Sequence, residues 1–264
     1  MSTATHMSTA TQEIGDVDTT ALVRDRSLKT SYVAIKPWID RALAVVMLLA
    51  SAPIILVSLL LVRITSRGPG LYTQQRLGLA GKVFTIYKIR TMYQDSECHG
   101  GPRWCVTGDP RVTPVGRFLR RCHLDELPQI INILKGEMSL VGPRPERPEF
   151  RAQLERAIPG YGQRLIVRPG VTGLAQVQQP PDEDLASVRR KLSYDLCYVE
   201  RMNLWLDLRL ILATPFRCVG VPFVWIGRIF RLPLPDSEQG PDSLAADASL
   251  ASNLIVTERY VGVN

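Results

Sequence analysis

The sequence has 264 residues, of which 45% are hydrophobic and 22% are charged. This length suits one or two domains, and this composition excludes collagen, a disordered tail protein and a disulfide scaffold. The net charge of +7 predicts an anionic partner, and the mean hydropathy of +0.02 argues against a protein with many membrane helices.

The N-terminal segment, residues 1–35, is predicted to be disordered. A long apolar segment follows: residues 42–62 are twenty-one residues without a charge, enough to cross a bilayer core of about 30 Å. However, Pro53 interrupts the segment, and basic residues flank both of its ends. A kinked helix that enters the membrane and returns explains both features, and a single span that tolerates the proline explains the length equally well.

The basic excess lies in the middle of the chain. Between Arg63 and Arg168, eighteen basic residues stand against nine acidic ones. Nucleic acid, phosphorylated metabolites and an anionic membrane surface are the partners that fit such a block. Cys98-His99 and Cys122-His123 are the only hints of a zinc site, and the five cysteines favour unpaired thiols in a reducing compartment.

A β-hairpin is predicted after Gly70. Two β-rich runs flank the turn at residues 78–81. In the second run, Lys88 and Arg90 share one face because side chains alternate along a strand. They would form a pair of cations, unless this face is simply solvated.

A carboxylate pair opens the next predicted helix. Leu124, Leu127, Ile130, Ile131 and Leu134 recur at helical spacing and predict a core face that excludes Asp125 and Glu126. Pro128 is tolerated only in a first turn, so the helix should begin near Asp125. Two carboxylates at a helix N-terminus with arginines nearby suit a divalent cation and a phosphate ligand, whereas an ordinary Asp N-cap is the plainer interpretation.

Two arginines are held next to prolines further along the chain. Arg144 stands in Gly-Pro-Arg-Pro, and Arg168 stands in Arg-Pro-Gly. A rigid arginine suits bidentate phosphate binding, although plain loops also contain this pattern.

These motifs together resemble the bacterial sugar transferases, also called monotopic phosphoglycosyl transferases. The resemblance rests on KIRTM, LDELPQ, NILKGEMSLVGPRP and RPGVTGLAQV, and it extends from about Lys36 to about Leu212. It implies an α+β, mainly helical fold: a small cytoplasmic catalytic domain with a β-hairpin, anchored by one kinked re-entrant membrane helix and interfacial helices. The family's usual Ser-Pro kink is replaced here by Ala52-Pro53, with Ser51 one position earlier.

The resemblance also implies a reaction and a site. A sugar 1-phosphate would move from a UDP-sugar to polyprenyl (undecaprenyl) phosphate, with release of UMP and through a covalent aspartyl intermediate, to initiate polysaccharide or glycoconjugate synthesis. Asp125 matches the nucleophile, Glu126 completes the acidic dyad, and both would hold Mg²⁺. The substrate-binding residues implied are Lys88, Arg90, Arg120, Arg144 and Arg168.

The predicted organisation follows from these assignments. After the disordered segment come the re-entrant helix at 36–66, the catalytic domain at 67–212, an interfacial aromatic and basic segment at 213–235, and an acidic tail at 236–264. A helix packed on the core is the alternative for 213–235. The expected location is the bacterial inner membrane with the site facing the cytoplasm, and a homodimer is left open.

Two other functions fit the sequence less well than the transferase. A catalytically inactive membrane-anchored scaffold of a polysaccharide assembly complex is the alternative, but it has no need of the dyad. No nucleic-acid partner is expected, because a nucleic-acid site would hardly place an acidic pair at its centre.

Overall fold

The computed structural model describes residues 30–94, 109–180 and 184–235. Within them the chain is mainly helical with two small sheets, which confirms the predicted mainly helical α+β class. Cys98, Cys105 and the predicted acidic tail lie outside the described residues.

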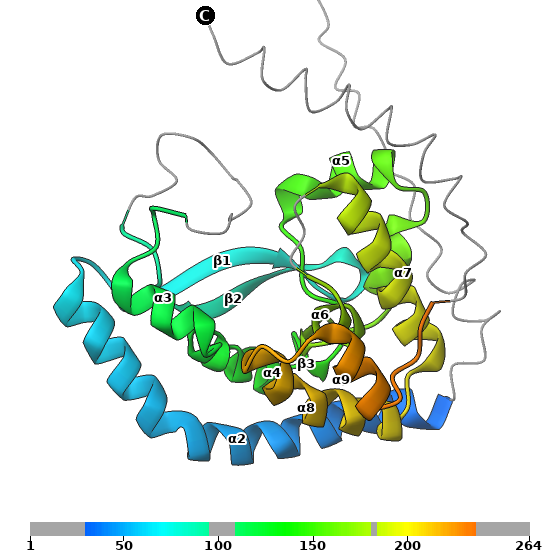
Figure 1. The fold of residues 1–264 in the computed structure, drawn as a ribbon, viewed down its shortest axis with the longest axis horizontal. Helices are drawn as coiled ribbons and strands as arrows, with labels where there is room; N and C mark the ends of the chain where they lie inside the picture. The colour runs from blue at the N-terminus through cyan, green and yellow to red at the C-terminus, as the bar shows by residue number, and fades with distance from the viewer. Residues whose placement is uncertain (1–29, 95–108, 181–183, 236–264) are drawn as a thin grey trace, which may run out of the picture.

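Helices and strands follow one another in a mixed order (Figure 1). The first half of the chain forms α2 (Thr30–Thr65), β1 (Leu71–Leu77), η1 (Leu79–Gly81), β2 (Val83–Ile89), α3 (Pro114–Arg121), η2 (Leu124–Gln129), α4 (Ile130–Lys135) and β3 (Ser139–Val141). The second half forms α5 (Pro148–Ala157), η3 (Tyr161–Ile166), β4 (Gly170–Thr172), α6 (Leu174–Gln178), α7 (Leu185–Arg201), α8 (Leu204–Cys218) and α9 (Phe223–Ile229).

Helix α2 contains the whole predicted membrane segment. It begins at Thr30, so residues 30–35, which were predicted to be disordered, are helical instead. Figure 1 shows that α2 bends along its length. Pro53 lies inside it and lacks a backbone donor, and the Ser51 hydroxyl donates to the Met47 carbonyl at 2.6 Å. Both features favour bending, so a serine two positions before the proline still contributes to it.

Helix α2 is long and apolar enough to cross a membrane by length and composition. Over Tyr32–Thr65 only 17% of the most apolar stretch is buried. Exposed apolar side chains therefore cover most of its surface, among them Trp38, Leu49 and Ile64 at 71–73% exposure. A helix of a soluble core would bury such residues.

Both ends of α2 are tied to the rest of the protein. Near its start, Lys36 forms a buried ion pair with Asp207 of α8, and Tyr32 donates to the same carboxylate at 2.6 Å. Near its end, Arg90 donates to the carbonyls of Ser66 and Arg67 at 3.0 and 2.5 Å. Between these two points Ala44, Ser51 and Ser58 are also buried, so one side of α2 lies along the folded domain while the other side is exposed.

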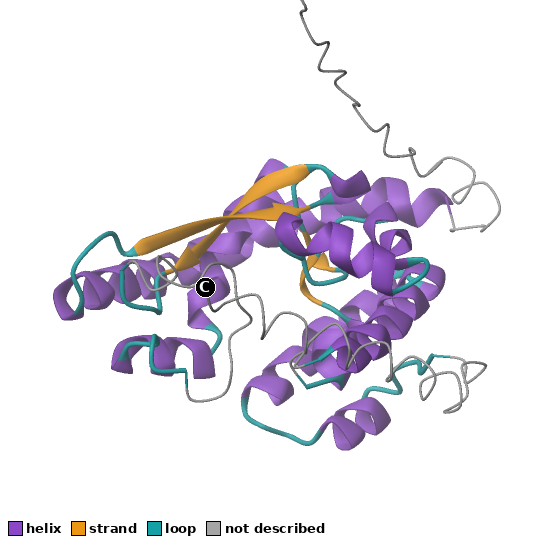
Figure 2. Ribbon diagram, turned by 90° about the horizontal axis from the view of Figure 1, so that it is seen from above, coloured by secondary structure: helices purple, strands orange, loops and turns teal. Residues whose placement is uncertain are grey.

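The predicted β-hairpin is present. Strands β1 and β2 pair antiparallel, with Leu71 opposite Ile89 and Leu77 opposite Val83. The short η1 turn between them holds Ala80 and Gly81 in the left-handed region. Figure 2 shows the hairpin as a twisted ribbon running past the helices.

A second sheet joins the two arginine–proline loops. Strands β3 and β4 are parallel, and Gly170, the first residue of β4, donates to the carbonyl of Pro143 just after β3 at 2.9 Å. A Cβ at Gly142 or Gly170 would overlap the opposite backbone, so only glycine permits this close approach.

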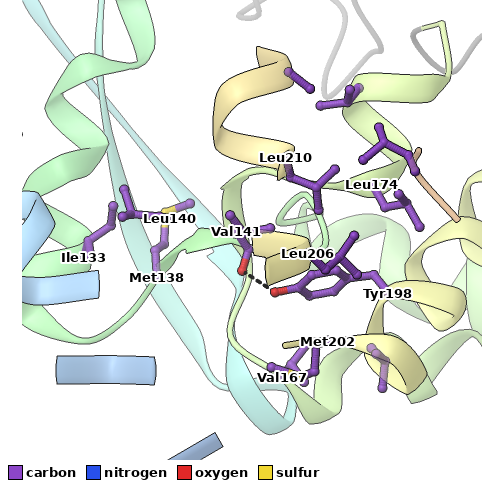
Figure 3. Packing of buried hydrophobic residues seen from close by; sticks show 14 of the residues in the cluster. Ile133, Met138, Leu140, Val141, Val167, Leu174, Tyr198, Met202, Leu206 and Leu210 are labelled. Carbon is purple, nitrogen blue, oxygen red and sulfur yellow. Dashed lines mark hydrogen bonds between the residues drawn. The ribbon is translucent and has the colours of Figure 1, made fainter. Parts of the chain in front are cut away.

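The main core surrounds this second sheet. Side chains from β3, α6, α7 and α8 pack together there, including Val141, Leu174, Tyr198, Leu206 and Leu210 (Figure 3). Burying an aromatic ring and several aliphatic side chains supplies most of the stability of such a domain. The Tyr198 hydroxyl donates to the Val141 carbonyl at 3.0 Å, so its polar end is also satisfied.

Candidate active site

The acidic dyad lies in the first turn of η2, which continues directly into α4. His123 precedes this turn and adopts a left-handed backbone conformation with φ of 53°. Residues other than glycine rarely adopt it, and Asn, Asp and His are the commonest among those that do. The prediction that Asp125 caps the helix is wrong, because the chain turns two residues earlier. The dyad still lies at the helix start.

Asp125 and Glu126 are buried, with 7% and 9% exposure, whereas Ile131 is 38% exposed. The predicted core face was therefore partly wrong. Hydrophobic periodicity places apolar residues inside but does not show that cations from distant segments surround a carboxylate. Those cations offset the free-energy cost of burying the two carboxylates.

Glu126 is held by two cations. Lys88 of β2 donates to its Oε1 at 2.7 Å, and Arg144 donates to Oε1 and Oε2 at 2.6 and 3.3 Å. Burial alone would raise the pKa of Glu126, but Arg144 and Lys88 outweigh it and hold the pKa well below its usual range. Glu126 is therefore an ionised anchor for both cations, and a poor proton acceptor.

Asp125 differs from Glu126 in its contacts and in the direction of its pKa shift. Among the described residues, its carboxylate accepts no hydrogen bond and forms no ion pair. Burial and the adjacent Glu126 charge raise the pKa of Asp125, and Lys88, Arg120 and Arg144 offset this only in part. An ionised carboxylate without hydrogen-bond partners is poorly solvated, which makes it a competent nucleophile.

The loop that carries Arg144 is held in place by a hydrogen bond to its main chain. Arg164 of η3 donates to the main-chain carbonyl of Arg144 at 2.7 Å. Arg164 also forms an ion pair with Asp195 at 2.8 Å, and it donates to the Tyr161 hydroxyl at 2.7 Å. Arg144 is thus positioned at its backbone by Arg164 and at its side chain by Glu126.

The other predicted substrate-binding residues lie in different places. Arg120 donates to the Thr91 hydroxyl at 2.7 Å and acts electrostatically on Asp125. Arg90 turns instead toward the end of α2, and Arg168 donates to the carbonyl of Gly136 at 2.9 Å, at the far end of α4 from the dyad. The structure therefore brings Lys88, Arg120 and Arg144 to the dyad but gives Arg90 and Arg168 bonds elsewhere.

A cavity of about 430 Å³ adjoins the dyad. Its polar residues include Glu126 and Arg144, and most of its lining is apolar, from η2, α4, β3 and α6. Met47 of α2 forms part of one wall and is 41% exposed, while Thr214, Arg217 and Cys218 of α8 form another. The cavity therefore connects the dyad with the exposed apolar surface of α2.

Sequence reasoning missed the cavity residues of α8. The sequence predicts Arg217 only as part of an interfacial segment, and its place in the cavity depends on the long-range packing of α8 on β4. Thr172 and Thr214 make that contact, with their hydroxyls 2.7 Å apart. One signal was available: Arg217 is the only charged residue in residues 210–220.

The residues fit a magnesium ion that is bound by few protein ligands and is completed by water and substrate phosphates. Within the described chain no three potential ligands gather into an all-protein metal site. Asp125, however, offers a carboxylate free of hydrogen bonds, and Mg²⁺ commonly binds through one or two carboxylates with water and substrate phosphates. Glu126 is less suited to ligation, since its Oε1 receives bonds from both cations.

Comparison with known proteins identifies the family. The model of the bacterial sugar transferase family matches residues 31–220. A UDP-N-acetylgalactosamine-undecaprenyl-phosphate N-acetylgalactosaminephosphotransferase of Aeromonas hydrophila is 42% identical over 69% of this chain and 43% of its own length. A UDP-glucose:undecaprenyl-phosphate glucose-1-phosphate transferase of Caulobacter vibrioides is 42% identical over 62% of this chain and 61% of its own length.

A shorter relative matches over most of its length. The exopolysaccharide production protein PSS of Rhizobium leguminosarum is 41% identical over 63% of this chain and 86% of its own length. By contrast, the chain spans only about two fifths of the Aeromonas protein. The matched region contains nearly all of α2, the dyad, the arginine loops and every lining residue of the cavity, and on this evidence the chain belongs to the bacterial sugar transferase family.

Proposed function

We propose that this protein is a membrane-bound phosphoglycosyl transferase. It transfers a sugar 1-phosphate from a UDP-sugar to undecaprenyl phosphate and thereby initiates a polysaccharide or glycoconjugate. The names of its relatives support both substrates. The observation that carries the proposal is the unequal dyad, in which Glu126 is held by two cations and Asp125 is free of hydrogen bonds.

The proposed chemistry has two steps at Asp125. A carboxylate oxygen of Asp125 attacks the phosphorus nearest the sugar, the bond to the other phosphate breaks, and UMP leaves with that bridging oxygen. A phosphate oxygen of the lipid then attacks the acyl phosphate, which frees Asp125 and yields a lipid diphosphate sugar. Covalent catalysis divides one difficult transfer into two easier ones.

The residues around the dyad supply the electrostatics. Lys88 and Arg144, fixed by Glu126, are oriented before substrate arrives, so they lose little entropy when they bind a phosphate. Three cations, including Arg120, face two carboxylates, which leaves a surplus of one positive charge for an anionic diphosphate. Asp125 and the substrate phosphates would hold Mg²⁺, which supplies the remaining neutralising charge.

We further propose that α2 is a re-entrant anchor in the bacterial inner membrane, with the site on the cytoplasmic side. Contacts between the domain and both ends of α2 support re-entry. Helix α8 extends the apolar surface, since Leu204, Trp205, Leu212 and Phe216 are 43–65% exposed. Cation–π pairs of Arg217 with Phe223 and of Arg228 with Trp225 suit the headgroup region.

The test is direct reconstitution. The purified protein in detergent is incubated with Mg²⁺, undecaprenyl phosphate and a panel of UDP-sugars, and UMP release is measured. Release with one sugar, dependent on the lipid phosphate and abolished by D125N, is the expected result. A folded protein that releases no UMP with any donor contradicts the proposal and favours the scaffold.

A further inference from the structure

We infer that the cavity beside the dyad is the binding site for the acceptor lipid phosphate and that Arg217 binds its phosphate. This inference rests on the proposed function, which requires a lipid phosphate to reach Asp125 from the membrane. It goes further because it assigns the acceptor to one cavity and to a residue outside the motifs that define the reaction.

The first argument is the charge left over in the cavity. Three cations line it: Arg144 is paired with Glu126, and Lys191 with Glu146 at 3.7 Å. Within the described residues, Arg217 has no carboxylate partner, and its buried Nε makes no hydrogen bond. Its guanidinium lies over the Phe223 ring, 4.4 Å from the centroid, which orients it without neutralising it.

The second argument is that most of the lining is apolar, although Thr172, Gln176 and Thr214 also contribute to it. Leu127, Ile130, Val171 and Ala175 form much of the wall and offer no polar side-chain atoms to a nucleotide. A uracil or ribose against this apolar wall would leave several of its hydrogen-bonding groups unsatisfied, at a substantial cost. An isoprenoid chain has no such groups and gains free energy from burial.

The third argument is the position of the cavity. Met47, one of its lining residues, belongs to the exposed apolar surface of α2. Phe216, next to Arg217 on α8, is 43% exposed. A lipid could therefore enter from the membrane with its tail against Met47 and its phosphate at Arg217, in the same cavity that Glu126 and Arg144 line.

The test separates binding of the acceptor from binding of the donor. R217A is expected to raise the apparent KM for undecaprenyl phosphate by roughly tenfold or more, as the loss of a charge-assisted hydrogen bond would. The KM for the UDP-sugar should change less than about twofold. R217K keeps the charge and should recover part of the affinity. R228A is the matched control, because Arg228 also lies over an aromatic ring at the membrane side but does not line the cavity.

A second readout does not depend on turnover. Cys218 lines the cavity, so undecaprenyl phosphate should slow its alkylation by a maleimide, measured by mass spectrometry of its peptide. Inorganic phosphate and UDP-sugar should not protect it, which distinguishes a lipid from a free anion. Protection should be weaker in R217A than in R228A.

The outcomes are distinguishable from failure of the proposed function. If wild type turns over but R217A leaves the acceptor KM unchanged, raises the donor KM equally, or behaves like R228A, the inference is wrong. If wild type releases no UMP with any donor yet undecaprenyl phosphate protects Cys218 in an Arg217-dependent manner, the lipid site stands and the transferase activity does not.

Discussion

Arg164 donates a hydrogen bond of 2.7 Å to the main-chain carbonyl of Arg144, whose side chain binds Glu126. The guanidinium of Arg164 is in turn paired with Asp195 of α7, and both side chains are only 2% exposed. A buried ion pair in the second half of the chain therefore holds the loop that presents a cation to the dyad. The geometry of the site depends on α7 as well as on the motif residues.

Replacing Arg164 should disturb both stability and the site. R164M removes the ion pair that Arg164 makes with the buried Asp195 carboxylate, so we expect a loss of about 3–5 kcal/mol in the free energy of unfolding. The double variant R164M/D195M removes both charges and should be more stable than R164M alone. Denaturant unfolding in detergent measures this. Equal stability of the single and double variants would show that the Arg164–Asp195 ion pair does not contribute to the free energy of unfolding.

Asp125→Asn should abolish turnover without lowering stability. The carboxylate accepts no hydrogen bond within the described residues. Burial and the Glu126 charge raise its pKa more than the three nearby cations lower it, so the neutral amide removes a net cost of burying a charge. We expect an unchanged or slightly higher Tm together with no UMP release. Wild-type activity in D125N would remove the assignment of Asp125 as the nucleophile.

Glu126→Gln should have the opposite effect on stability. Lys88 and Arg144 lose the charge that both of them bind, so two cations remain close together without a carboxylate. The full cost of breaking a buried pair is reduced here because the Arg144 side chain is 41% exposed. We expect a loss of about 1–3 kcal/mol, visible as a lower Tm than that of D125N. A Tm equal to that of D125N would contradict the anchoring role.

The dyad was easier to predict than its surroundings. The alternation of strand residues predicts Lys88 on a cationic face, and the structure brings it to Glu126, because the turn at Gly78 and Gly81 fixes the hairpin locally. The same rule could not show that Arg90 binds the end of α2, since that contact depends on how two distant segments pack. Burial of Asp125 was missed for the same reason.

The C-terminal helices show most clearly that long-range packing is hard to predict from sequence. The sequence predicts one interfacial segment at 213–235, but α8 runs continuously across residue 212 and presents Leu204 and Trp205 on its exposed surface. Its opposite side carries Asp207, which is buried against Lys36 and Tyr198. Sequence periodicity reveals the amphipathic pattern but not which distant residues satisfy the buried acid.

Glu146 should make stability depend on pH. Burial alone would raise its pKa, but Lys191, Arg164 and Arg76 lower it below the usual value. Its contribution should be complete above the unfolded pKa of about 4.3 and should be lost as pH falls through the depressed folded pKa. The difference in unfolding free energy between wild type and E146Q should therefore shrink on acidification.

The neighbouring Glu149 provides a control for this measurement. Its side chain is 47% exposed and pairs with Arg147 at 3.6 Å, so E149Q should show a small difference at every pH. Matched pH series of both variants, followed by thermal unfolding, separate the two cases. A gap between wild type and E146Q that is constant from neutral to acidic pH would show that Glu146 is not stabilised as an anion.

The last prediction concerns the two ends of α2. If the helix is re-entrant, residues before and after it lie on the cytoplasmic side, because both ends contact the same folded domain. Single cysteines in place of Asp16 and of Lys82, an exposed residue of the hairpin turn, should both resist a membrane-impermeant maleimide in intact cells. Both should react once the inner membrane is permeabilised. Labelling of the Asp16 position alone in spheroplasts would establish a full span, and the contacts of Lys36 and Tyr32 with Asp207 could not then form, because the start of the helix would lie across the bilayer from α8.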